Sequence, residues 1–270
     1  MADLDPDALM DFARTLLDLG AKEIMPRYQA CATSTKPDGS HVTEADRAAE
    51  TAITEAIRER FPDHAILGEE FGASGPEDAR WRWVLDPLDG TTPFVLGLAG
   101  FGTLVGLELD GEPWLGAVGL PVTGEHVLAA RGAGCWHRGP TGQVRRTQAA
   151  EDVPLGEAFV TYSGMHNSLA YDQAPFLCTA RMTKAAGRRR AVTDCTQHML
   201  VARGATHVSL DPTMAPWDTA ALVPCVEEAG GVCSDVFGRR QGVVRSGSLV
   251  CAAGPKLLAE VIEQLAARHE

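Results

Sequence analysis

The chain is organised around the segment Trp83-Val84-Leu85-Asp86-Pro87-Leu88-Asp89-Gly90-Thr91-Thr92-Pro93-Phe94. Its first residues are apolar and predict a buried strand. The strand ends in two carboxylates, Asp86 and Asp89, and Gly90 then begins a turn into a short helix. Pro93 suits the first turn of a helix, because its missing N–H group would have no partner there.

Two chemical preferences meet at the end of this strand. Carboxylate oxygens bind hard divalent cations, and the free N–H groups of a helix N-terminus, here near Gly90 and Thr91, bind phosphate. Together they predict a metal-assisted phosphate site. An alternative interpretation stays open at this point, because Asp-Pro and Asp-Gly pairs are also common in ordinary turns.

Length, composition and charge limit the classes of protein. The chain has 270 residues, enough for a substantial core, and its 45% hydrophobic content is typical of a globular protein. With 24 basic and 36 acidic residues its net charge is −12, which argues against nucleic acid or an anionic membrane as a partner. An acidic protein still binds a phosphate ester when metal ions invert the local field.

The cysteines and the N-terminus predict a cytoplasmic protein. None of the seven cysteines forms a C-x-x-C pair, so a zinc ribbon is not expected, and their odd number suits a reducing compartment. Residues 1–10 contain three aspartates and no basic residue, unlike a signal peptide. No uninterrupted apolar run approaches the length of a membrane span.

The periodicity predicts an α+β (mixed α/β) fold in two halves. Apolar residues recur at helical spacing over Asp5–Tyr28, where Pro26 can end the helix, and over Thr43–Phe61. Strands follow, interrupted by a polar loop over Phe71–Ala79. We place residues 1–150 in an N-terminal half that carries most metal ligands, and residues 151–270 in a C-terminal half.

In the C-terminal half we expect one continuous helix over Asp218–Ala229, followed by Gly230-Gly231. Pro224 would lie inside this helix and cost it a hydrogen bond.

Three further acidic features lie at the ends of predicted elements: Asp46, Glu69 and Asp218. Each has a structural alternative. Thr43-x-x-Asp46 matches a capping box, Glu69 could belong to a solvated loop, and Asp218 could be a helix N-cap. These alternatives do not explain why acidic residues recur at junctions beside buried elements. Carboxylates from distant segments converge on a metal ion in this way.

Four motifs occur together and in one order. Asp86–Thr92 resembles the D-P-[IL]-D-G-T-x motif of the inositol monophosphatase superfamily of Mg²⁺-dependent, lithium-sensitive phosphatases, and Gly68-Glu69-Glu70 resembles its G-E-E element. Lys36–Asp46 matches the K-x-D-x-x-x-V-T-x-A-D opening of that family. Pro216–Ala221 with Glu228–Gly231 resembles its W-D-x-A-A…E-A-G-G element. The resemblance covers most of the chain and implies a layered α-β-α-β-α sandwich.

The resemblance implies a metal ligand set. Asp86 would bridge two Mg²⁺ ions. Glu69 and the backbone carbonyl of Leu88 would complete the first metal site, and Asp89 and Asp218 would complete the second. Glu69 would also contact a third, weaker ion, so two to three ions per site are expected. All these ligand atoms are oxygens, as Mg²⁺ prefers.

The resemblance also implies catalytic roles and a homodimer. Asp46 and Thr91 would orient and activate the attacking water, with Glu69 taking part through the third ion. The amides of Gly90 and Thr91 would hold phosphate oxygens. Two cations about 3.5–4 Å apart reduce the repulsion between a phosphate monoester and an anionic nucleophile, which is why such sites hydrolyse these esters.

The segment before Trp217-Asp218 bears on the substrate, a small phosphorylated alcohol. Its D-P-x-M-x-P-W-D arrangement, which begins at Asp211, is more similar to the histidinol-phosphatase branch than to inositol monophosphatases proper. An aspartate there suits a cationic amine, because charge-assisted contacts are strong. Asp194 is a second candidate for substrate binding. Alternatively, Asp211 starts a turn with Pro212.

These features are compatible with three functions. The first is Mg²⁺-dependent hydrolysis of histidinol phosphate to histidinol, a step of histidine biosynthesis. The second is the same chemistry on inositol 1-phosphate or another polyol or sugar phosphate. The third is a non-catalytic binding module of the same fold. The retention of every expected ligand and catalytic residue argues against the third.

Overall fold

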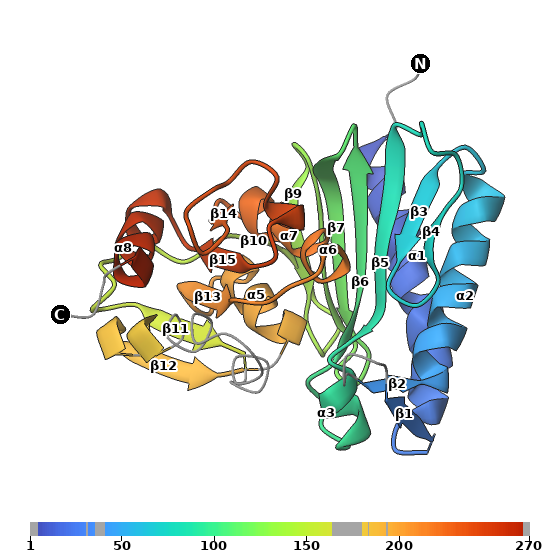
Figure 1. Ribbon diagram of the computed structural model, residues 1–270, viewed down its shortest axis with the longest axis horizontal. Helices are drawn as coiled ribbons and strands as arrows, with labels where there is room; N and C mark the ends of the chain where they lie inside the picture. The colour runs from blue at the N-terminus through green and yellow to red at the C-terminus, as the bar shows by residue number, and fades with distance from the viewer. Residues whose placement is uncertain are drawn as a thin grey trace.

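The computed structural model describes residues 5–30, 32–35, 41–163, 180–182, 184–192 and 194–266. These residues form five layers: a pair of helices, an eight-stranded sheet, a middle layer of helices, a five-stranded sheet and a closing helix (Figure 1). This arrangement confirms the predicted α-β-α-β-α sandwich. Within the described ranges, no helix is both long enough and apolar enough to cross a membrane.

Helices α1 (Pro6–Ile24) and α2 (Glu44–Arg60) form the first layer. The side chain of Asp5 caps α1, and the short 3-10 helix η1 (Met25–Arg27) follows, so the chain leaves the α-helix just before Pro26, as predicted. The apolar faces of both helices pack on the first sheet in one core cluster, which includes Leu9, Met10, Leu16, Ile53, Ile57, Trp83, Leu85, Val105, Leu107 and Leu115.

The eight-stranded sheet has the order β10-β9-β8-β7-β6-β5-β3-β4. Its strands are β3 (Ala65–Gly68), β4 (Gly72–Ser74), β5 (Trp81–Asp89), β6 (Gly102–Leu109), β7 (Glu112–Leu120), β8 (Glu125–Ala130), β9 (Gly134–Arg138) and β10 (Val144–Thr147). A separate pair, β1 (Thr33–Thr35) and β2 (His41–Thr43), precedes α2, and helix α3 (Thr91–Val95) follows β5. β5 pairs parallel with β3 and antiparallel with β6.

The prediction of an uninterrupted loop over residues 71–79 is wrong. Residues 72–74 form β4, which pairs antiparallel with β3 at the edge of the sheet. The chain reverses at Glu69-Glu70, and the positive φ of Gly72 (71°) lets it return alongside β3. Short strands of small residues such as Gly72-Ala73-Ser74 carry no strong apolar alternation, so their pairing is set by the neighbouring strand.

The five-stranded sheet has the order β12-β11-β13-β15-β14. Its strands are β11 (Phe159–Tyr162), β12 (Arg188–Ala191), β13 (Val208–Asp211), β14 (Val232–Ser234) and β15 (Leu249–Ala252). Helix α8 (Pro255–Ala266) covers its outer face. The boundary predicted between residues 150 and 151 falls in the connection between the two sheets; the independence of the halves stays a prediction.

Helices α5 (Asp194–Ala202), α6 (Pro216–Thr219) and α7 (Leu222–Glu228) lie between the two sheets (Figure 1), and the 3-10 helix η3 (Val243–Arg245) lies beside α6. One core cluster joins α5 and α7 to both sheets. Its members include Val84, Leu104, Val118, Met199, Leu222, Val223, Cys225 and Cys251. The middle layer therefore fixes the C-terminal segments against the end of β5.

The prediction of one helix over residues 218–229 is wrong, because the chain breaks at Ala220-Ala221 between α6 and α7. This junction presses against the first sheet at two glycines. A Cβ on Gly106 would lie 2.8 Å from Ala220 Cβ, and a Cβ on Gly116 would overlap the carbonyl of Ala221. Pro224 is the third residue of α7, where the N–H group has no helical partner, so the expected loss of a hydrogen bond does not occur.

Candidate active site

The end of β5 is irregular. Asp86 pairs with Leu104 of β6, whereas Asp89 pairs with Gly102, so β5 carries one extra residue between the two pairs. Such a β-bulge bends a strand and redirects its side chains. The backbone N–H of Leu88 donates to Asp86 Oδ1 at 3.0 Å, and Thr103 Oγ1 donates to the carbonyl of Pro87 at 2.9 Å. The bulge therefore holds the two aspartates near each other.

An apolar cluster on the side of α1 and α2 holds this bulge in place. The side chain of Leu88 is 1% exposed and packs with Phe94 and Phe101 against α1 and α2. Because that side chain is fixed, the position of the Leu88 backbone carbonyl, a predicted ligand, is fixed as well.

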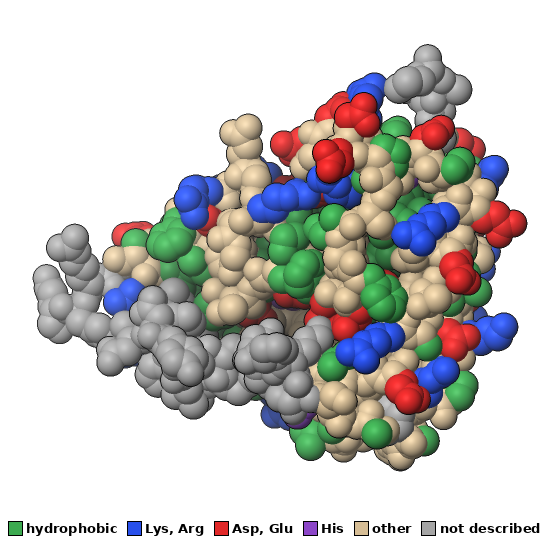
Figure 2. Space-filling view, turned by 45° about the vertical axis from the view of Figure 1, so that its right-hand side comes forward, with side chains coloured by type: hydrophobic (Ala, Val, Ile, Leu, Met, Phe, Trp, Pro, Cys, Tyr) green, Lys and Arg blue, Asp and Glu red, His purple; other side chains and the backbone are tan. Residues whose placement is uncertain are grey.

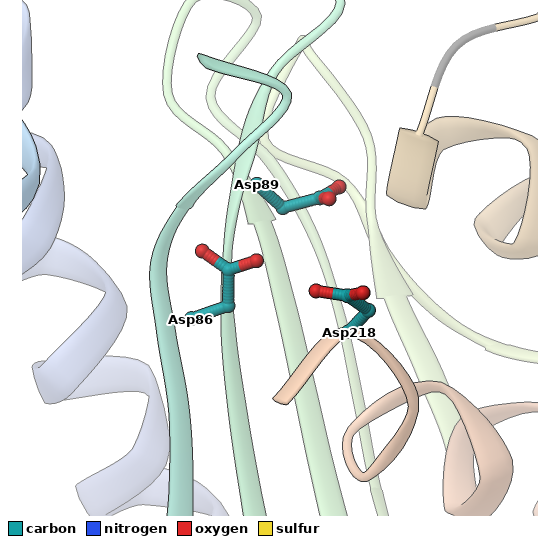
Figure 3. Close-up of side chains that lie close together, drawn as sticks. All are labelled: Asp86, Asp89 and Asp218. Carbon is teal, nitrogen blue, oxygen red and sulfur yellow. The ribbon is translucent and has the colours of Figure 1, made fainter. Parts of the chain in front are cut away.

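Asp218 joins the two aspartates from α6. One carboxylate oxygen of each of Asp86, Asp89 and Asp218 lies within 4.8 Å of the others, and the side chains face a common space (Figure 3). Asp218 is the third residue of α6, and its Oδ2 accepts the N–H of Ala215 at 2.7 Å. The alternative interpretation of Asp218 as the N-cap is therefore wrong, since Ala215 holds that position.

The electrostatics of the cluster favour a cation. Burial raises the pKa of Asp86 well above its usual range, and the nearby charges of Glu69, Asp89 and Asp218 raise it further. The pKa of Asp89 is also raised well above its usual range, and burial is the largest cause. Burial likewise raises the pKa of Asp218 to about 7. Close, poorly hydrated carboxylates repel one another, and a divalent cation relieves that repulsion.

Glu69 is brought into the same cluster. Its backbone N–H donates to the carbonyl of Leu85 at 3.1 Å, which places it beside the end of β5. Its carboxylate raises the pKa of Asp86 through its charge and through a hydrogen bond, and its charge acts on Asp46 and Asp218 as well. In the view of Figure 2, acidic side chains lie beside a hollow near the middle of the molecule.

Asp46 uses its two oxygens for different contacts. Oδ2 accepts the backbone N–H of Thr43 at 2.8 Å and the Thr43 hydroxyl at 2.6 Å, which completes a capping box. Oδ1 lies 3.2 Å from Thr91 Oγ1, which is also 3.2 Å from the carbonyl of Leu88. Burial raises the pKa of Asp46. The capping interpretation is therefore correct for one oxygen, while the other contacts the predicted catalytic threonine.

Gly90 is the residue before α3 and has a φ of 84°. A Cβ at this position would lie 3.0 Å from the carbonyl oxygen of Gly100 and 3.1 Å from Asp194 Oδ2. The first N–H groups of α3, which begins at Thr91, have no partner within the helix. Gly90 and Thr91 directly follow Asp89, a member of the carboxylate cluster; their role in binding phosphate stays a prediction.

The two predicted substrate residues border the cluster on the side of the C-terminal half. Asp194 begins α5 with a φ of 48°, and its charge raises the pKa of Asp89. Asp211 ends β13, and its charge raises the pKa of Asp218. Asp211 Oδ1 also accepts the N–H of Thr213 at 3.2 Å, so the alternative turn interpretation is correct as well. Lys36, from the opening motif, lies outside the described residues.

Two residues that support the site were not predicted from the sequence. The backbone N–H of Cys195 donates to Asp89 Oδ2 at 2.6 Å; a backbone donor leaves no signal in the sequence. The buried carboxylate of Glu50 accepts the N–H groups of Glu70 and Phe71, next to Glu69. A signal existed here, because Glu50 lies three residues before the core residue Ile53, on the apolar face of its helix.

Comparison with known proteins now identifies the family. The model of the inositol monophosphatase family matches residues 5–270. This chain belongs to the inositol monophosphatase family. It is therefore a phosphoric monoester hydrolase, in a family that acts on small phosphate esters.

Three known proteins show the range of similarity to this chain. A histidinol-phosphatase of Chlorobaculum parvum is 38% identical over 217 residues, which cover 80% of each chain. A Nus factor SuhB of Pasteurella multocida is 33% identical over 241 residues, 86% of this chain and 85% of the relative. A solved inositol monophosphatase of Zymomonas mobilis superposes with a TM-score of 0.84 at 25% identity, over 98% of this chain and 100% of the other.

The donor set fits the Mg²⁺ on which the inositol monophosphatase family generally depends. The three clustered ligand atoms are carboxylate oxygens that already repel one another. Mg²⁺ prefers such hard oxygen donors over sulfur and nitrogen.

Proposed function

We propose that this phosphatase hydrolyses histidinol phosphate to histidinol in a reaction that needs Mg²⁺. The observation that carries the proposal is the convergence of Asp86, Asp89 and Asp218 within 4.8 Å, although Asp218 comes from the other half of the chain. A purely structural role does not explain three mutually repelling carboxylates at one point.

Each residue of the cluster has a role in this proposal. Asp86 would bridge two Mg²⁺ ions, Glu69 and the carbonyl of Leu88 would complete one metal site, and Asp89 and Asp218 the other. When bound, the ions neutralise charge on the phosphate, acidify water and stabilise the leaving alkoxide. A third, weaker ion at Glu69 is part of the same proposal.

The attacking water is oriented by Thr91 and Asp46. When Thr91 donates its hydroxyl hydrogen to Asp46 Oδ1, 3.2 Å away, a lone pair of Oγ1 is left to accept a hydrogen from water. A lone pair of that water can then face the phosphorus, and positioning dominates catalysis of phosphoryl transfer. The amides of Gly90 and Thr91 would hold the phosphate oxygens.

Two carboxylates and one relative support the choice of substrate. Asp194 and Asp211 lie beside Asp89 and Asp218, respectively, and add negative charge where the alcohol would extend from the phosphate. Histidinol carries an amine that is cationic at neutral pH, so these carboxylates favour it over a neutral polyol. The histidinol-phosphatase of Chlorobaculum parvum, at 38% identity, supports the same substrate.

The alternative substrate is inositol 1-phosphate or another polyol or sugar phosphate, supported by the similarity to the Zymomonas mobilis inositol monophosphatase. We also propose that the protein is a homodimer and that it works in the cytoplasm. The reaction would be a step of histidine biosynthesis. The five described cysteines are free thiols, in keeping with a reducing compartment.

Two measurements test the proposal. In a phosphate-release assay with histidinol phosphate, inositol 1-phosphate and sugar phosphates, we expect the highest kcat/KM for histidinol phosphate; a place among the poorest substrates would refute it. Asp86→Asn should reduce Mg²⁺-dependent release to background while circular dichroism stays unchanged. Asp78→Asn, which removes an exposed carboxylate from the loop before β5, is the matched control.

A further inference from the structure

Glu50 is a buried carboxylate that the proposed reaction does not use. It is 1% exposed and lies on α2, one helical turn after Asp46. Its Oε2 accepts the backbone N–H of Glu70 at 2.8 Å, and its Oε1 accepts that of Phe71 at 3.0 Å. A buried carboxylate with one N–H group on each oxygen is a firm anchor, because charge-assisted hydrogen bonds are the stronger kind.

The chain around Glu69 is shaped to receive this carboxylate. A Cβ on Gly68 would overlap the carboxylate of Glu50, so only glycine leaves room for it. On the other side, the N–H of Glu69 donates to the carbonyl of Leu85 in β5. The backbone of Glu69 is therefore held from two directions, by β5 through its own N–H and by α2 through the next two N–H groups.

We propose that Glu50 is a positioning residue that sets the Mg²⁺ affinity of the carboxylate cluster by fixing the turn that presents Glu69. This inference rests on the proposed function, since it takes Glu69 as a metal ligand. One helix then positions two parts of the site: Asp46 contacts Thr91, and Glu50, four residues later, holds the turn at residues 69–71. Outer partners of metal ligands typically change metal affinity about 10–100-fold when they are removed.

Charge and geometry predict different results for two substitutions. Glu50→Gln removes the charge and places an NH₂ group against one of the two backbone N–H groups. Glu50→Asp keeps the charge but is one methylene too short to reach both N–H groups. If position matters, both variants lose affinity; if Glu50 acts only through its negative charge, the aspartate variant binds Mg²⁺ as wild type does.

The experiment is isothermal titration of Mg²⁺ into the substrate-free, full-length protein. We expect Glu50→Gln and Glu50→Asp to bind Mg²⁺ about 10–100-fold more weakly than wild type. Phosphate release should recover at high Mg²⁺, so that the apparent KM for Mg²⁺ rises more than kcat falls. A wild-type affinity in either variant would overturn the positioning role.

Matched variants separate positioning from stability. Glu55→Gln removes an exposed carboxylate from the same helix, and Thr54→Val changes a buried residue one turn beyond Glu50; both should bind Mg²⁺ as wild type does. Gly68→Ala, which keeps Glu50 but displaces its carboxylate, should reproduce the loss if Glu50→Gln does not fold. Wild-type protein that binds no Mg²⁺ would refute the proposed function, whereas equal binding by wild type and the Glu50 variants would refute this inference alone.

Discussion

Thr91 and Asp46 meet side chain to side chain, with Thr91 Oγ1 3.2 Å from Asp46 Oδ1, although 45 positions separate them in the sequence. The contact joins the start of α3 to the start of α2. The other oxygen of Asp46 is already occupied by Thr43. Helix capping therefore fixes the orientation of the carboxylate that contacts the hydroxyl, and one residue serves both the fold and the site.

The Thr91 hydroxyl should be required for turnover. Thr91→Val keeps the shape of the side chain but removes both the donor to Asp46 and the acceptor for water. We expect kcat for phosphate release to fall about a hundredfold, the low end of the range for groups that direct proton transfer. Thr91→Ser should retain most of the activity, and Thr92→Val, at the exposed neighbouring position, should behave as wild type. A wild-type kcat for Thr91→Val would contradict the assigned role.

Local patterns in the sequence account for much of this site. The apolar run before Asp86 predicted β5, and Thr43-x-x-Asp46 predicted the start of α2, because strand burial and helix capping are encoded by adjacent residues. The break at Ala220-Ala221 could not be predicted in this way. It depends on the close approach of the chain to Gly106 and Gly116, which are more than a hundred residues away in the sequence.

Substitution of Gly90 by alanine should lower both the stability of the protein and its phosphate-release rate. An alanine there must keep a φ near 84°, and its Cβ would crowd the carbonyl of Gly100 and the carboxylate of Asp194. We expect a loss of about 1–3 kcal/mol in the free energy of unfolding, measured with urea. The phosphate-release rate should fall as well, because Thr91 is displaced.

Gly111→Ala is the matched control for this prediction. Gly111 lies in a hairpin turn at a φ of 83°, but nothing lies within 4 Å of an added Cβ. It carries the same backbone strain without the collision and lies away from the carboxylate cluster. If Gly90→Ala and Gly111→Ala are equally active, the close packing around Gly90 has no catalytic importance.

Asp211 should determine the preference for a cationic alcohol. Asp211→Asn keeps an oxygen that can accept the N–H of Thr213, so the turn is preserved, but it removes the negative charge. We expect the ratio of kcat/KM for histidinol phosphate over inositol 1-phosphate to fall about tenfold, the loss of one charge-assisted hydrogen bond of about 1.5 kcal/mol. An unchanged ratio would mean that Asp211 serves only the turn.

Asp194→Asn tests the second substrate residue in the same assay. Asparagine tolerates the positive φ of this position, so the start of α5 should keep its geometry. We expect a fall in this ratio comparable to that of Asp211→Asn. If both carboxylates contact the amine, the ratio should fall further in the double variant than in either single variant. A loss of activity that is equal on both esters would instead show that Asp194 acts on the metal cluster.

His64 should make the protein less stable in acid. It stacks on Phe61 with 4.7 Å between ring centroids, and its Nδ1 is the acceptor for the Nε1–H of Trp83 at 3.1 Å. Burial lowers the pKa of His64 below its usual 6.5. As the pH falls through about 6.5, the unfolded chain binds a proton before the folded protein does, so the free energy of unfolding decreases; above that pH both states are neutral and the effect vanishes.

The test compares urea unfolding of wild type and His64→Asn at about pH 7.5 and about pH 5.5. Asparagine offers an oxygen close to the position of Nδ1 but does not titrate, so it can accept the hydrogen bond from Trp83 at both pH values. The decrease in stability between the two pH values should be smaller in the variant, while a residual decrease persists from His126, His137 and His207, whose pKa values are also lowered by burial. Equal decreases in both proteins would show that His64 is protonated without cost in the folded state.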